Sequence, residues 1–379
     1  YVHHPEDIYP DGLWGWKKNK SQGEANYRDP LFVDYSLFHG YLATTGEHLA
    51  VSNTPAVEPH KGRIFIVGQS YEPDGLKGFL IGVDLVIQDG NRKPDAVEVF
   101  RVEIGAGSGT SPAISPDGSF VIVADKSKVL YCIKTYPEID DNGTVKENPI
   151  IWKMRGAGNA GSPTIDSEGI IYTAGHLVGD TIKAVNPYEH GHRLLRNKPD
   201  ILWQKNFNAL AETMLPKIKA IRGKQSLVYS NKRVATFNSA ITVSSRFVLV
   251  MCMLGYKVTG KNGESYASPS KMVLLTLDKH TGNMAAPPVE MPSESTTPIS
   301  VSPDGKIAAV SAATIGPIMN YWLKNMQSPI KMPDAIKNSL LKPSGGITVL
   351  APVSYLAFAI EQLNFEVLMN KKAITALQQ

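Results

Sequence analysis

The stretch SPAISPDGSFVIVAD, residues 111–125, decides how this chain is expected to fold. Its centre, Pro116-Asp117-Gly118, is typical of a tight turn: proline presets φ, aspartate bonds back to the backbone and glycine takes positive φ. The apolar residues on both sides are rich in valine and isoleucine, which favours two short strands. The stretch therefore predicts a strand, a tight turn and a second strand.

Four further copies of this pattern make it a repeat. They are TPAVEPHKGRIFIVGQ from Thr54, SPTIDSEGIIYTAGH from Ser162, NSAITVSSRFVLVMC from Asn238 and TPISVSPDGKIAAVS from Thr297. We align the five copies on Pro55, Pro112, Pro163, Ser239 and Pro298. Third strands are expected at 129–135, 180–186 and 272–278, and fourth strands at 150–156 and 201–207.

Two tryptophans support the repeat independently. Trp152 and Trp203, in the expected fourth strands, are separated by the same number of residues as Pro112 and Pro163. A repeated unit of four strands is typical of a β-propeller blade, because a blade buries its faces only against its neighbours. We predict an all-β protein: a β-propeller of six to eight four-stranded blades, with short helical insertions and a C-terminal helix.

The S-P-A-I pattern, the motif LLTLDKHTG at 274–282 and the two tryptophans resemble the PQQ-like propeller repeat. The SPDG turns within 111–118 and at 302–305 also resemble repeats of peptidase-type propellers. The resemblance covers roughly residues 50–350. It implies the fold and leaves the function open, since this fold hosts many activities.

Three kinds of segment depart from the repeat. Residues 1–35 lack periodicity and are expected to form an extended arm, which leaves 36–352 for the propeller. Insertions are expected at about 208–231 and 313–343, the first with a short helix that breaks near Pro216. Apolar residues at helical spacing predict a helical tail over 353–379.

The charge, the cysteines and the apolar runs of the sequence limit the functions and locations that we expect for the protein. The net charge is +4 and scattered, so we expect no nucleic-acid partner. Cys132 and Cys252 lie in apolar runs and are expected to be buried thiols. No apolar run is long enough to predict a membrane-spanning helix. The start at Tyr1, and the glycosylation triplets at Asn19 and Asn142, favour an exported protein that is secreted or periplasmic.

The binding site is expected at one mouth of the central channel. The glycine-rich loops 105–112 and 156–163 enter first strands there, and their backbone N–H groups could approach a ligand. Fitting the blades together near the axis is the other use for these glycines, and it stays open. The predicted ligand-binding residues, on these loops and on loops between second and third strands, are Gln69, Ser108, Thr110, Asn159, Ser162 and Tyr256.

Three further residues are candidate metal ligands. Asp125, His176 and Asp180 are expected in loops between second and third strands. Carboxylates and an imidazole that converge on a channel could hold one divalent cation, with calcium as the candidate. The same side chains could equally bond one another and water, so the cofactor is undetermined.

Three functions fit these patterns. The first is an exported propeller that acts as a binding scaffold for a protein or small-molecule ligand at the channel mouth, with an oligomer contact through the insertions as a further option. The second is a metal-dependent hydrolase or lactonase that uses the channel. The third is a quinoprotein oxidoreductase, although the adjacent cysteines of its alcohol-oxidising members are absent from this sequence. We predict the scaffold, and whether the protein is an enzyme stays open.

Overall fold

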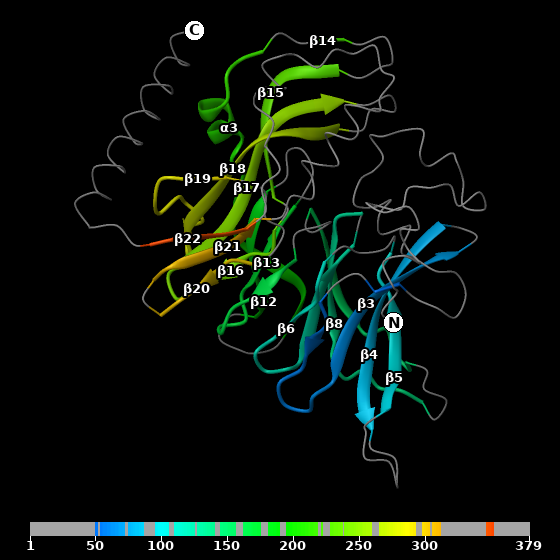
Figure 1. Cartoon of the computed structure of the whole chain (residues 1–379). Helices are drawn as coiled ribbons and strands as arrows, with labels where there is room; N and C mark the ends of the chain where they lie inside the picture. The colour runs from blue at the N-terminus through cyan, green and yellow to red at the C-terminus, as the bar shows by residue number, and fades with distance from the viewer. Residues whose placement is uncertain are drawn as a thin grey trace.

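A computed structural model shows successive antiparallel β-sheets, drawn in Figure 1. The predicted arm at 1–35, the insertion at 313–343 and the tail at 353–379 lie outside the described residues. The structure describes residues 50–51, 54–72, 75–86, 95–105, 110–125, 127–140, 145–156, 162–175, 181–189, 195–218, 221–222, 228–237, 239–259, 265–292, 298–303, 305–311 and 346–351.

The first three sheets each contain four strands joined in chain order, and we call them blades I to III. Blade I contains β2 (Ala56–Val57), β3 (Ile64–Glu72), β4 (Gly75–Val86) and β5 (Asp95–Glu103), with β1 (Ala50–Val51) added beside β3. Blade II contains β6 (Ala113–Ile114), β7 (Phe120–Ala124), β8 (Val129–Lys134) and β9 (Ile150–Arg155). Blade III contains β10 (Thr164–Ile165), β11 (Ile171–Ala174), β12 (Ile182–Tyr188) and β13 (Leu195–Lys205).

Two further sheets complete the described part of the chain. Blade IV contains β16 (Thr242–Val243), β17 (Phe247–Thr259), β18 (Ser265–Asp278) and β19 (Val289–Met291), with β14 (Ile221–Arg222) and β15 (Val228–Phe237) added beside β17. Blade V contains β20 (Ser300–Val301), β21 (Ile307–Ser311) and β22 (Gly346–Leu350). The helix α3 (Asn208–Met214) precedes β14 and ends before Pro216, as its apolar spacing predicts.

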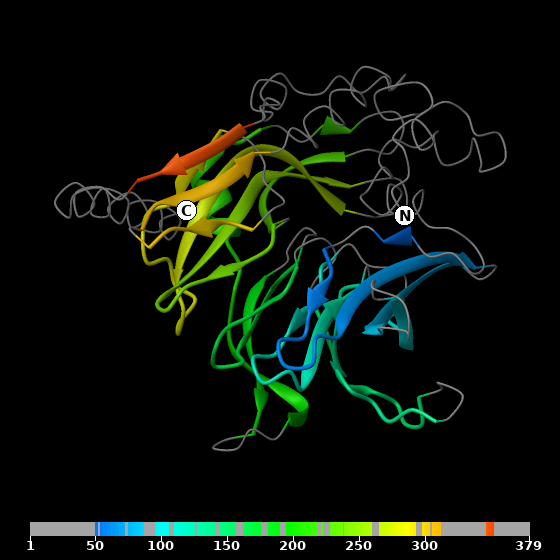
Figure 2. The same cartoon turned by 60° about the horizontal axis from the view of Figure 1, so that its bottom comes forward.

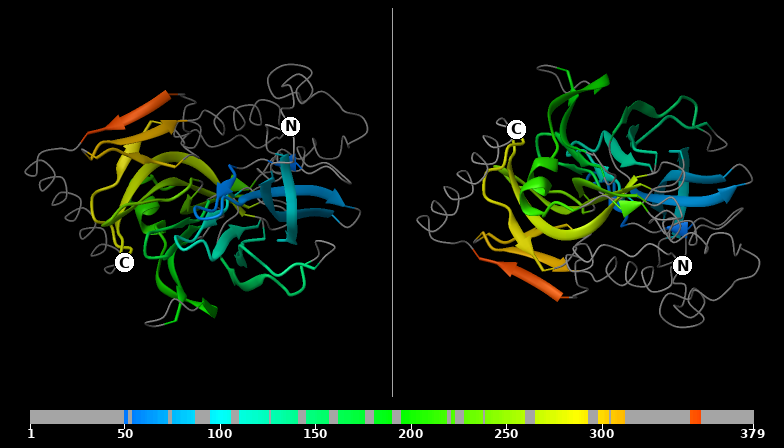
Figure 3. Two further views of the ribbon diagram at one scale, coloured as in Figure 1. Left: turned by 90° about the horizontal axis from the view of Figure 1, so that it is seen from below. Right: turned by 90° about the horizontal axis from the view of Figure 1, so that it is seen from above.

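The sheets are arranged as propeller blades. The short first strands of blades I to IV lie beside one another, β2 by β6, β6 by β10 and β10 by β16. Figures 2 and 3 show the sheets following one another in chain order, from blue blade I to the orange β22. The all-β fold of propeller-type blades is therefore confirmed, whereas the number of blades in the whole chain stays a prediction.

The core is divided among the seams, by which we mean the contacts between consecutive blades. Each of the four seams between blades I and V has its own cluster of buried apolar side chains. In blade II, for example, Val121 and Val123 pack on blade I, while Phe120 and Ile122 pack on blade III. A strand whose two faces are both buried needs apolar residues without alternation, which explains the continuous run at 120–124.

Two copies of the repeat have a register that differs from our alignment. Val243 pairs with Val248 across the first turn of blade IV, whereas Ile114 pairs with Val121 across the first turn of blade II. The first turn of blade IV is therefore shorter than that of blade II. The residues equivalent to Pro112 are consequently Ile241 and Ile299. The alignment on Ser239 and Pro298 is corrected accordingly.

A bulge places one aromatic residue at the same position in three fourth strands. Gly82 pairs with Phe100, Cys132 with Trp152 and Ala184 with Trp203, and in each blade the register shifts directly beside that pair. All three aromatic side chains are buried. The sequence pattern reveals the two tryptophans, but Phe100 is missed because phenylalanine replaces tryptophan in blade I.

Blades I and IV have second and third strands that extend beyond the blade. β3 has 9 residues and β17 has 13, compared with 5 in β7 and 4 in β11. The added lengths are paired on the side away from the third strand, since β1 pairs with the second half of β3 and β15 with that of β17. Gln69 and Tyr256 therefore lie inside strands, which corrects their expected position in loops.

Candidate functional site

Thr110, a predicted ligand-binding residue, is fully buried at the entrance to blade II. Its Oγ1 donates to the carbonyl of Ala124 (3.0 Å) and accepts from the N–H of Ala124 (3.2 Å). Ser239 occupies the equivalent position in blade IV, and its Oγ accepts from the N–H of Met251 (3.2 Å). A buried hydroxyl at this position thus holds the entering chain to the second strand in both blades.

Asp125, a predicted metal ligand, follows β7 and is also buried. Its carboxylate accepts from the N–H of Val129 (2.8 Å) and from the hydroxyl of Tyr131 (2.9 Å). Burial raises the pKa of Asp125 above its ordinary value, although these bonds favour the charged form. Gly105 closes over the group: with its φ of +85°, a Cβ would lie 2.5 Å from Asp125 Oδ2.

Ser162 and Tyr256 also make bonds within the protein. Ser162 Oγ accepts from the N–H of Ser111 (2.9 Å), a bond between blades III and II. Tyr256 donates its hydroxyl to the carbonyl of Pro216 (2.8 Å), which fixes the chain after α3 onto β17. Gln69 is buried on the face of β3 toward blade II.

Four of the predicted site residues lie outside the described part of the chain. They are Ser108, Asn159, His176 and Asp180. Among the residues that the structure does describe, no group of three His, Cys, Asp or Glu side chains could hold a metal ion. The ligand-binding and metal-binding assignments stay predictions.

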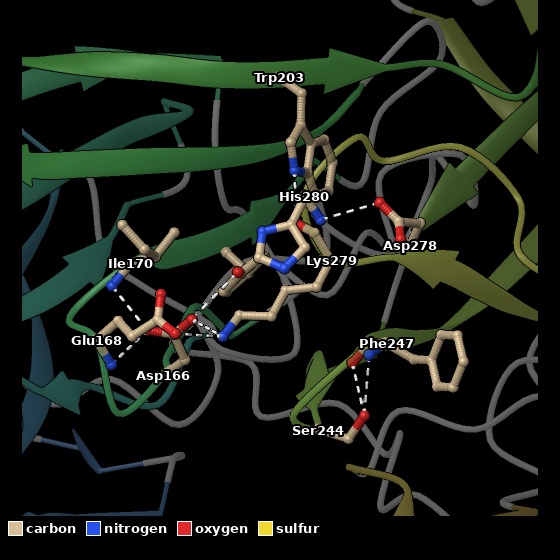
Figure 4. Close-up of polar contacts among 10 residues, drawn as sticks. Asp166, Glu168, Ile170, Trp203, Ser244, Phe247, Asp278, Lys279 and His280 are labelled. Atoms are coloured by element: carbon tan, nitrogen blue, oxygen red, sulfur yellow. Dashed lines mark hydrogen bonds and ion pairs between the residues drawn. The ribbon is translucent and has the colours of Figure 1, made fainter.

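A buried ion pair that the sequence analysis does not predict joins blades III and IV (Figure 4). Lys279 Nζ lies 2.9 Å from Asp166 Oδ2 and 3.5 Å from Glu168 Oε1. The other oxygen of Asp166 accepts from the N–H groups of Glu168 and Ile170 (2.9 Å each). Burial opposes the charge of Lys279, but the bond and attraction to Asp166 prevail and raise its pKa. The network fastens the first turn of blade III to the residue that follows β18, the third strand of blade IV.

The backbone of Lys279 is held by the same blade as its side chain. Trp203 Nε1 donates to the carbonyl of Lys279 (2.9 Å), and its ring packs against the glycine of the LLTLDKHTG motif, Gly282. Trp152, the equivalent residue of blade II, has no partner for its Nε1 among the described residues. In blade III, the aromatic residue at the repeated position therefore contacts blade IV.

The first turns of blades I and II border a shallow hollow of about 440 Å³ at the opposite end of the blades from the predicted mouth. The buried Glu58 accepts there from the N–H groups of His60 (2.9 Å) and Lys61 (2.6 Å) and from the hydroxyl of Tyr136 (2.7 Å). Burial opposes the charge of Glu58, but these bonds together lower its pKa below the ordinary value. The arrangement joins the two blades.

A second contact crosses the same seam. Arg63 donates to the carbonyl of Thr135 (3.1 Å) and holds Asp84 through two bonds of 2.8 Å. Its guanidinium carbon lies 4.4 Å from the ring centre of Tyr136. The hollow is lined by Glu58, His60, Lys61, Asp117, Gly118, Ser119, Lys134, Thr135 and Tyr136. The bonds from Tyr136 to Glu58 and from Arg63 to Thr135 thus join blades I and II, whereas the other bonds of Glu58 and Arg63 lie within blade I.

Several solved structures are similar to this chain at low sequence identity. No family model and no curated protein matches the chain. Its structure is similar to BamB from Moraxella catarrhalis, at 12% identity and a TM-score of 0.31, over 70% of this chain and 82% of that one.

Two further solved structures are similar to a comparable degree. One is the PQQ-bound aldose sugar dehydrogenase from Streptomyces coelicolor, at 13% identity and a TM-score of 0.36, over 73% of this chain and 77% of that one. The other is Sqt1 from Chaetomium thermophilum, at 10% identity and a TM-score of 0.37, over 72% and 70%. The assignment of blades rests on the strand pairing of this chain.

Proposed function

We propose that this protein is an exported binding scaffold that recognises a protein ligand with the two long hairpins of blades I and IV. The observation that supports the proposal is the length of the hairpins β3–β4 and β17–β18, whose second strands are longer than those of blades II and III. Both hairpins project from the end of the blades at which the chain passes from the second to the third strand. The predicted mouth lies at this same end. Insertions on one face of a rigid scaffold commonly carry recognition.

The backbone of the long hairpins is suited to this role. The pairing of β17 with β18 continues from Phe247 and Asp278 to Thr259 and Ser265, so the projecting part is a hydrogen-bonded ladder. β15 adds a second ladder along its other side, from Phe237 to Val228. A projecting sheet held by several ladders loses little conformational entropy when a ligand binds, which favours affinity.

The mouth residues support a scaffold over catalysis. The hydroxyl of Thr110 makes two internal bonds and the carboxylate of Asp125 accepts two, so both hold the backbone in place. No helix within the described residues is long and apolar enough to cross a membrane. Export remains part of the proposal, and fractionation of the producing cells tests it, since the protein is expected outside the cytoplasm.

Site-specific photo-cross-linking in the producing cells tests the recognition surface. A photoreactive amino acid is placed at Lys77 on β4 or at Lys257 on β17, both in the extended parts. Matched control positions are Lys61 and Lys134, which border the hollow at the opposite end of the blades. We expect the same protein adduct from both hairpin positions and none from the controls. Adducts at the controls alone, or none at any position, would contradict the proposal.

A further inference from the structure

The seam between blades IV and V contains a cluster of methionines, which sets it apart from the other three seams. Met251, Met253, Met272 and Met291 are 1–4% exposed and belong to its apolar cluster. Among the described residues no other methionine is buried, and this cluster has no aromatic ring, whereas each of the other three clusters has at least two. Contact with an aromatic ring, a common role of buried methionine sulfur, therefore does not explain this cluster.

The strand register brings three of these thioethers close together. Met253 of β17 pairs directly with Met272 of β18, and Met251 lies two residues before Met253 on the same face of the sheet. Directly paired side chains have Cβ atoms about 4.5–5.5 Å apart, and residues two apart along a strand are separated by about 7 Å. The methionine side chain is long and unbranched, so three sulfur atoms at these positions can meet at one point.

Two further residues border the three methionines. Met291 of β19 pairs with Met272 from the other side, which places it two strands from Met253, about 9–10 Å away, so it covers the group without joining it. Thr236 of β15 pairs directly with Met253, is 1% exposed, and its Oγ1 has no hydrogen-bond partner among the described residues. A buried hydroxyl oxygen without a partner is costly, and a positive charge nearby compensates it.

The type of donor selects the type of ion. Thioether sulfur is a neutral, soft donor that favours Cu(I), whereas calcium and magnesium take oxygen ligands. We propose that Met251, Met253 and Met272 form a binding site for one Cu(I) ion in the seam between blades IV and V. The site is separate from the metal site predicted at the channel mouth, and it does not rest on the proposed function.

The test is anaerobic competition for Cu(I) between the full chain and bicinchoninic acid, a chelator that forms a coloured Cu(I) complex. We expect the natural protein to hold one Cu(I) per chain. Met272→Leu removes the sulfur but nearly keeps the side-chain volume, so the fold should be retained. Loss of an outer-shell partner weakens metal binding about 10–100-fold, so loss of this ligand should weaken it at least about tenfold. Met154→Leu, partly buried in the seam between blades II and III, is the matched control and should bind as the natural protein does.

The two cysteines are competing sulfur donors, and the pH separates them from the methionines. A thiol must lose its proton to bind a metal, and burial raises the pKa of both Cys132 and Cys252. Cu(I) held by thiols should therefore bind about tenfold more weakly for each thiol when the pH is lowered from 7 to 6. A thioether has no proton to lose, so the affinity of the methionine site should be the same at both pH values.

Met253→Leu removes a second ligand, so it decides the question even if Met272→Leu does not fold. Weaker Cu(I) binding in these variants, together with an affinity in the natural protein that does not change between pH 7 and pH 6, supports the site. Equal affinity in the natural protein and in both methionine variants would overturn the proposal. An affinity that falls as the pH is lowered, or the absence of Cu(I) binding, would overturn it as well.

Discussion

Lys279 of blade IV and Asp166 of blade III are joined by an ion pair of 2.9 Å in which the side chains are only 6% and 5% exposed. The two residues are far apart in the sequence, and the pair closes the seam beside the contact between Trp203 of β13 and Gly282, which follows β18. Breaking one partner of such a pair leaves a buried charge without compensation.

Lys279→Met should therefore be strongly destabilising. We expect a loss of about 3–5 kcal/mol in the free energy of unfolding, measured by urea denaturation at pH 7. Lys271→Met is the matched control: Lys271 pairs with Glu290 at 2.7 Å, but those side chains are 32% and 57% exposed. An exposed pair contributes about 0–1 kcal/mol. Equal losses in the two variants would show that the buried pair has no special weight.

The acid stability of the seam between blades I and II should depend on Glu58. Its folded-state pKa is lowered, so its stabilising effect is present above the unfolded-state pKa and is lost as the pH falls through the folded-state value. We expect Glu58→Gln to be less stable than the natural protein at pH 7 and the difference to shrink toward pH 3. Urea denaturation at several pH values measures this. A difference that is constant with pH would contradict the assignment.

The same substitution should have different effects at two equivalent positions. Trp203→Phe removes the donor to the Lys279 carbonyl and should cost about 1–3 kcal/mol, because a buried acceptor loses its partner. Trp152→Phe removes an N–H that has no partner among the described residues, so its cost should be clearly smaller. Phe100 already shows that phenylalanine fits this position. Thermal unfolding of both variants measures the contrast, and equal costs would contradict it.

Tyr256→Phe should loosen the segment after α3. The hydroxyl of Tyr256 and the guanidinium of Arg233 hold the carbonyls of Pro216, Glu212 and Leu215 onto the long sheet. Removal of one hydroxyl should cost about 1 kcal/mol and speed amide exchange in 211–218 more than in blade II. Hydrogen exchange with mass spectrometry measures both regions. An unchanged exchange rate in 211–218 would show that the bond does not hold the segment.

The blade strands were predictable because each copy has a local signature. The proline, the turn residues and the β-branched runs act within about fifteen residues, so sequence alone identifies first and second strands. The register in blades IV and V was less accessible, since the turn before Phe247 is shorter and Ile241 replaces the proline. Phe100 was missed for a similar reason, because the repeat is defined by the place of an aromatic ring and not by tryptophan.

The candidate site was harder to predict than the fold. The expected loop positions 108, 159, 176 and 180 stay predictions, and the contacts of Thr110, Asp125 and Tyr256 depend on backbone atoms that no sequence pattern identifies. The pairing of Asp166 with Lys279 joins segments of different blades, so neither residue carries a local signal of it. The sequence does not show where a long strand ends and its loop begins. Gln69 and Tyr256 were therefore predicted in loops, although they lie in β3 and β17.

The division of the core into one cluster per seam has an evolutionary consequence. Blades II, III and IV each carry two half-interfaces, one on either face, and their buried apolar side chains in the described residues cluster with those of the adjoining blades. Duplication of the coding segment for one blade would then create a new seam from two existing half-interfaces and leave the distant ones unaltered. Divergence can proceed separately at each seam, as Tyr131 in blade II and Lys183 in blade III, which occupy one equivalent position, illustrate.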